Sequence, residues 1–121
     1  MMRKLIPAAL VLSLAAAFAF AQGEKKAAKI SGFVIDNMCA EMHGSEAEAK
    51  NHPNACALME ACEKSGFAIA TKEKVYKLDA HGNELALALI KESKTKKGLA
   101  VTAEGTLDGD TLRVDTLVAG Q

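Results

Sequence analysis

The chain has 121 residues, 50% of them hydrophobic and 25% charged, and its 15 basic residues balance 15 acidic ones. This near-neutral balance gives no electrostatic basis for binding nucleic acid. Four Phe, one Tyr and no Trp also leave few aromatic surfaces on which bases or sugars could stack. The length suits one domain with a modest core.

The N-terminus has the three parts of a secretory signal. Arg3 and Lys4 precede an apolar run over residues 5–20, and a small-x-small site follows at residues 19–21. The run is shorter than the ~20 residues that span a bilayer. The pattern therefore predicts a cleaved signal peptide (residues 1–21), a periplasmic or secreted location and no membrane anchor after cleavage.

The mature chain is predicted to start with a flexible arm, because residues 22–29 are polar, rich in Lys and without an apolar period. A single domain is expected over residues 30–121. Its first strand is predicted from Ile30 to Asp36, with a bulge or sharp bend at Gly32.

A helical insertion is predicted next. Ser45 and Glu48 have the spacing of a capping box, which predicts a short helix over residues 46–50. A second helix is predicted over residues 53–64, ended by Gly66. Its apolar residues follow the helical period and form one inward stripe: Ala55, Leu58, Met59 and Cys62.

The next segments are β-prone. Residues 67–71 and 75–78 form two short runs around Lys72-Glu73-Lys74, which predicts a hairpin. Residues 84–92 are ambiguous, because their leucines alternate as in a strand but also fit a helical period. Their alanine and leucine content, with Asn83 as a cap, favours a helix.

The C-terminal part is predicted to be a second hairpin. Apolar residues alternate over 99–107 and again over 112–118, on either side of Asp108-Gly109-Asp110. The order is thus strand, helical insertion, two strands, helix, two strands. This order predicts a mainly β fold, a five-stranded OB-like barrel with one insertion, and a split α+β sandwich is the alternative.

Metal-binding and redox-active residue types gather in the insertion. Cys39, His43, His52, Cys56 and Cys62 include every cysteine and all but one histidine of the chain. On the predicted helix, Cys62 faces inward and Cys56 lies about 120° away, so these two are poorly placed to bond to each other. We predict a Cys39–Cys62 disulfide, worth roughly 3 kcal/mol, with Cys39–Cys56 as the alternative.

The remaining thiol suggests a metal site. Cys56 follows His52 by one helical turn, and His43 precedes both in the adjoining loop. A thiolate with imidazoles is typical of Cu or Zn ligation. In the simpler alternative, His52 caps the helix, His43 is solvated and Cys56 is a spare thiol.

The cysteine motifs resemble those of a group of small exported bacterial proteins of unknown function. These share a G-x-V-x-D-x-x-C start, here residues 32–39, and an H-x-x-x-C-A-L-M-x-x-C-x-x-S-G middle, here residues 52–66. The resemblance implies export and a common domain with a β-rich C-terminal half. It implies no activity or ligand.

Two classes of function remain. The chain shows no serine triad, P-loop or paired-carboxylate pattern, which favours a disulfide-stapled binding or scaffolding domain of the cell envelope over an enzyme. Its partner would be a small ligand or an envelope protein. The alternative is a periplasmic Cu- or Zn-binding or thiol-redox protein that uses the Cys/His cluster.

Overall fold

The computed structural model describes residues 26–120, apart from the side chain of His43. The predicted signal peptide and the first half of the predicted arm, residues 22–25, lie outside the described residues. Within them, the strands are β1 (Lys26–Asp36), β2 (Phe67–Ala70), β3 (Val75–Leu78), β4 (Ala100–Asp108) and β5 (Thr111–Ala119). The helices are α1 (Asn37–His43), α2 (Glu46–Lys50), α3 (Asn54–Ala57), α4 (Glu60–Ser65) and α5 (Ala80–Glu92).

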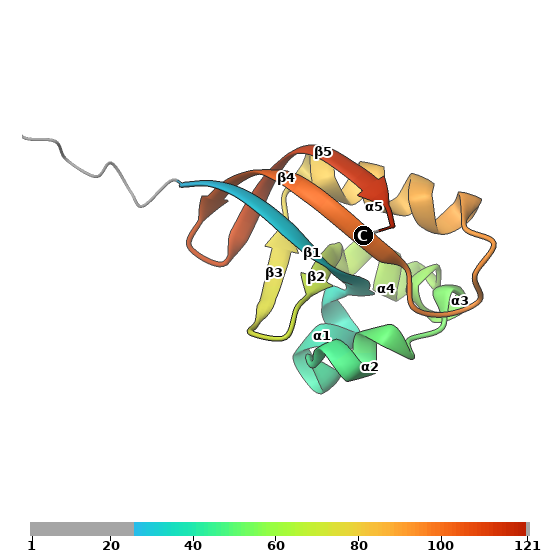
Figure 1. Cartoon of the computed structure of the whole chain (residues 1–121). Coiled ribbons are helices and arrows are strands. Elements are labelled where there is room, and N and C mark those ends of the chain that lie inside the picture. The colour runs from blue at the N-terminus through green and yellow to red at the C-terminus, as the bar shows by residue number, and fades with distance from the viewer. Residues whose placement is uncertain (1–25, 121) are drawn as a thin grey trace, which may run out of the picture.

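The strands close into a barrel in the order β1-β2-β3-β5-β4, with β4 pairing back to β1. All neighbours are antiparallel except β3 and β5, which are parallel. Figure 1 shows the insertion helices gathered where β1 ends and α5 lying beside β5. This arrangement confirms the predicted OB-like barrel, with a helical insertion after the first strand and a helix before the fourth.

Strand β1 joins two parts of the barrel by changing partner at Phe33. Its residues up to Phe33 pair with β4, and those from Phe33 onward pair with β2. Gly32 stands at this change because a Cβ there would lie 2.4 Å from the Ala70 carbonyl oxygen. The predicted start at Ile30 was four residues late, since Lys26 to Lys29 already pair with β4.

The insertion agrees with the prediction at α2 and differs from it in two other places. The capping box is confirmed at α2, where Ser45 Oγ accepts the Glu48 N–H at 3.1 Å. Helix α1 was not predicted. The single helix over residues 53–64 was wrong, because Met59 is extended (φ −63°, ψ 141°) and separates α3 from α4. The expected stripe fails with it, since Met59 is 60% exposed.

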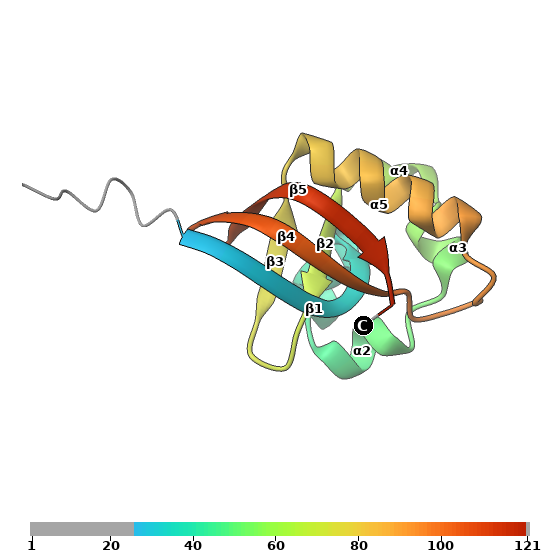
Figure 2. The same cartoon turned by 45° about the horizontal axis from the view of Figure 1, so that its top comes forward.

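Helix α5 covers the barrel next to β5, as Figure 2 shows. It begins four residues before the predicted start because Asp79, not Asn83, is its N-cap and accepts the Gly82 N–H at 2.9 Å. Asn83 instead accepts the Phe67 N–H and holds the start of β2. Both predicted hairpins are confirmed.

The core fills the barrel and extends under α5. Its largest fully buried apolar side chains are Phe67, Ile35, Ile69, Leu112 and Val101. Each comes from a strand, but they belong to two clusters. Phe67, Ile69, Leu112 and Val101 pack in the main core with α5, whereas Ile35 packs with Ala49 of α2 in a second cluster between the sheet and the insertion. Among residues 26–120, no helix has the length and apolar character needed to cross a bilayer.

Candidate functional site

The candidate site begins at Asp36, the last residue of β1. Asp36 is fully buried and is also the N-cap of α1, where its Oδ2 accepts the Cys39 N–H at 2.9 Å. An N-cap carboxylate is a favourable start for a helix because it satisfies a backbone donor that has no partner within the helix. This bond fixes the direction in which α1 leaves the barrel.

The second acceptor oxygen of Asp36 faces His52, which follows α2. His52 Nε2 lies 2.8 Å from Asp36 Oδ1, and the two side chains are 12% and 0% exposed. A carboxylate oxygen accepts hydrogen bonds, so Nε2 carries the proton and donates the hydrogen bond to Asp36. The His52 side chain therefore bonds to the end of β1, while its backbone N–H donates to Ala49 of α2.

Helix α4 brings a second thiol to Asp36. Cys62 is buried, and one Asp36 oxygen, Cys39 Sγ and Cys62 Sγ all lie within 4.8 Å of one another. Two bonds to Ser65 hold α4 against α1: the Asn37 Nδ2 donates to its carbonyl at 2.8 Å, and the Met38 N–H donates to its Oγ at 3.2 Å. The arrangement places two thiols from separate helices beside one buried carboxylate.

This environment opposes ionisation of both thiols. Burial, followed by the hydrogen bond and the charge of Asp36, raises the pKa of Cys39 to about 12. Burial and the charge of Asp36 also raise the pKa of Cys62. The thiolate is the nucleophile in cysteine chemistry, so these thiols are poorly suited to act as nucleophiles at neutral pH. The geometry suits two other uses, a disulfide or a metal site.

The structure brings together part of the predicted set. Cys39 and Cys62, the preferred disulfide pair, are neighbours, but within the described residues all three cysteines are free thiols. His52 reaches the site through Asp36, while Cys56 lies half-buried on α3 and is not a member of the Asp36, Cys39, Cys62 group. The side chain of His43 is outside the described part. A site built from His52, Cys56 and His43 thus stays a prediction.

Asp36 is the residue that sequence reasoning missed. It was interpreted only as a strand end, because aspartate is common at turns. Aspartate is a preferred N-cap residue, and its carboxylate can accept the N–H of the residue three positions on, here Cys39. This preference could have predicted α1. Nothing in the local sequence indicates that His52, sixteen residues further on, bonds to it.

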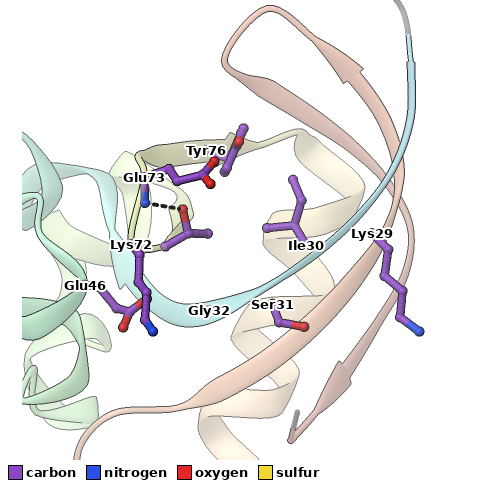
Figure 3. A pocket seen from close by; sticks show the side chains of 9 residues that line it. Lys29, Ile30, Ser31, Gly32, Glu46, Lys72, Glu73 and Tyr76 are labelled. Carbon is purple, nitrogen blue, oxygen red and sulfur yellow. Dashed lines mark hydrogen bonds between the residues drawn. The ribbon is translucent and has the colours of Figure 1, made fainter.

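A second feature lies on the barrel wall. A cavity of about 380 Å³ opens between β1, the β2–β3 turn and α2. Figure 3 shows Ile30 and Tyr76 on facing strands, with Glu46 and Lys72 toward the insertion. The lining residues are Lys29, Ile30, Ser31, Gly32, Glu46, Thr71, Lys72, Glu73 and Tyr76.

The cavity exists because β2 is short. Strand β2 pairs with β1 only over Phe33 to Asp36, so the stretch Lys29–Gly32 pairs with β4 on one edge and has no strand on the other within residues 26–120. The cavity therefore combines two apolar side chains, Ile30 and Tyr76, with several charged side chains and an open strand edge.

Comparison with known proteins adds no family: no family model, curated protein or solved structure matches the chain.

Proposed function

We propose that the protein is a small exported binding domain of the cell envelope, and that an extended segment of a partner protein adds to the open edge of β1. One observation carries this proposal: the edge at Lys29–Gly32 is unpaired within the described residues and lies beside the cavity. Addition of a strand to an exposed sheet edge is a recurrent mode of peptide recognition.

The backbone direction of β1 supports this mode. The Val34 N–H donates to Leu99 on the β4 side, and the Asn37 N–H donates to Gly66 on the β2 side. Because backbone groups alternate between the two edges of a strand, Lys29 and Ser31 present their N–H and C=O groups to the open edge. A partner strand can pair there without displacing a bond to β4.

The cavity supplies a place for one side chain of that segment. Ile30 and Tyr76 provide apolar surface, and Lys72 and Glu73 lie at the rim with opposite charges. An aliphatic or aromatic side chain can pack against Ile30 and Tyr76, while the mixed charges of the rim give no preference for a highly charged ligand. The ligand class is therefore a neutral, β-forming peptide.

A Cys39–Cys62 disulfide would stiffen the same wall. It would tie α1 to α4, and α1 also contacts α2, which carries Glu46 of the cavity. The proximity of the two thiols supports this bridge, and an oxidising compartment would favour it. Export is checked by sequencing the N-terminus of protein recovered from the cell envelope, which should begin at Gln22.

The binding test uses the oxidised mature chain, labelled with ¹⁵N and titrated with capped hexapeptides of alternating Val and Thr. Amide shifts are expected at residues 29–32 and 71–76. Ser31→Pro removes one N–H on the open edge and should weaken binding at least ten-fold. Ser31→Ala keeps that N–H and is the matched control. Absence of saturable shifts, or shifts confined to other strands, would overturn the proposal.

Metal handling is the second candidate function, favoured by the convergence of Asp36, Cys39 and Cys62. It concerns the reduced protein, whereas the peptide site does not depend on free thiols. A thiol-redox function is less well supported, because the raised pKa values of Cys39 and Cys62 leave little thiolate.

A further inference from the structure

Three potential metal ligands converge at the end of β1 from three different elements. Asp36 ends the strand, Cys39 is in α1 and Cys62 is in α4, and their ligand atoms lie within 4.8 Å of one another. Ligands 2.3 Å from a tetrahedral ion are about 3.8 Å apart, so small side-chain rotations would bring these atoms to coordination distance. The contacts between α1 and α4 hold the two thiols in place without a metal.

We infer that the reduced protein binds one Zn²⁺ through Cys39 Sγ, Cys62 Sγ and a carboxylate oxygen of Asp36. Two sulfur ligands select a soft or borderline ion, and the added carboxylate favours Zn²⁺ over Cu⁺. Ca²⁺ and Mg²⁺ prefer a shell of oxygen atoms and do not suit this set. Cys39 is half-buried, so solvent can reach the site and supply a water as the fourth ligand.

His52 acts on this site as a positioning residue. Its Nε2 bonds to Asp36 Oδ1, and the Cys39 N–H bonds to Oδ2, so both oxygens have fixed directions. Each oxygen keeps a further lone pair for an ion. Groups that orient a metal ligand in this way typically change metal affinity by about 10- to 100-fold.

Zinc binding and the proposed disulfide use the same two thiols, Cys39 and Cys62, and therefore exclude each other. Zinc binding converts two thiols to two thiolates and releases two protons. Disulfide formation releases two protons and passes two electrons to an oxidant, such as an oxidised disulfide compound. The insertion is thus tied at Cys39 and Cys62 in either condition, by zinc when reduced and by a covalent bond when oxidised.

The test is native mass spectrometry of the reduced mature chain with ZnCl₂, combined with X-ray absorption at the zinc edge. Wild type and Cys56→Ser should each bind one zinc with two sulfur ligands, because Cys56 is outside the group. Cys62→Ser should bind at least ten-fold more weakly, and His52→Gln should lose affinity while keeping its circular dichroism. Disulfide-bonded protein should bind none at this site.

Several results would overturn the inference. Substoichiometric zinc in wild type, or loss of zinc in Cys56→Ser, would do so, and so would equal binding by the oxidised protein. A sulfur count other than two would also exclude this ligand set, and that measurement stands even where Cys62→Ser fails to fold. Unchanged affinity in His52→Gln would overturn the role given to His52. Peptide titration uses the oxidised chain, so each proposal can fail separately.

Discussion

Replacement of Asp36 by alanine tests the central bond network directly. The substitution removes the N-cap of α1, a loss that typically costs about 1 kcal/mol. It also leaves the largely buried His52 Nε2 without its acceptor, which costs about 1–3 kcal/mol. We therefore expect Asp36→Ala to lower the free energy of unfolding by about 3 kcal/mol, a large part of a small domain's stability.

The measurement is urea unfolding of the oxidised chain in the presence of a chelator, followed by circular dichroism. The urea midpoint should fall while the slope stays constant, since the surface area exposed on unfolding is unchanged. Asp36→Asn keeps one acceptor oxygen and should cost less than alanine. Asp115→Ala is the matched control, because Asp115 is an exposed aspartate on β5 and should change stability by about 0.5 kcal/mol or less.

A double-mutant cycle with His52→Ala separates the shared bond from the cap. The two substitutions remove the same hydrogen bond, so their costs should sum to more than the cost of the double variant. A cost below about 1 kcal/mol for Asp36→Ala, or full additivity in the cycle, would refute this account of Asp36.

In the oxidised protein, Cys39→Ala and Cys62→Ala should each cost about 3 kcal/mol in urea unfolding, and the double variant no more, because both remove one bridge. Full additivity would contradict a shared disulfide. Gly82→Ala should lower stability by about 1–2 kcal/mol although alanine favours helices, since its Cβ would lie 2.6 Å from Val114 Cγ2 and 2.9 Å from Leu78 Cβ. A higher thermal midpoint would refute that steric reasoning. In the reduced, metal-free protein, the pKa of Cys39 is about 12 against an ordinary 9.0, so the unfolded chain loses this proton at lower pH than the folded protein does. The contribution of Cys39 to the free energy of unfolding should therefore be full below pH 9 and should decline between pH 9 and 12. Unfolding at pH 8, 9 and 10 should show this decline relative to Cys39→Ala, and parallel curves for the two proteins would contradict it.

The barrel could be predicted because its signals are local. Residues 99–107 and 112–114 alternate around a turn that contains Gly109, and this alternation matches their buried and exposed faces. A register shift at Asp115 reverses the rest of β5, so that Leu117 is buried and Val118 is 57% exposed, against the predicted pattern. The glycine in β1 marks the place where the strand changes partner, because only glycine permits the close approach of the Ala70 carbonyl. Periodicity and turn chemistry therefore sufficed for the strands and their order.

The insertion could not be predicted equally well, because its helices are short and their apolar period is weak. Helix α1 exposes Met38 by 43% and Met42 by 70%, so no inward stripe announces it. The predicted helix over residues 53–64 counted Met59 as a core residue, whereas Met59 is the extended residue that separates α3 from α4. Tertiary packing decides such one-turn helices, since they are not stable alone.

Asp36 explains why so irregular an insertion keeps a defined shape. A carboxylate with no exposed surface is costly unless donors surround it, and the barrel end provides none of these donors from its own strands. The Cys39 N–H and His52 Nε2 come from the insertion, so the insertion must return to β1 to satisfy Asp36. That return also brings Cys62 beside Cys39. The need of buried Asp36 for hydrogen-bond donors therefore brings Cys39 and Cys62 together. A disulfide or a bound metal would form between thiols whose positions Asp36 has already set.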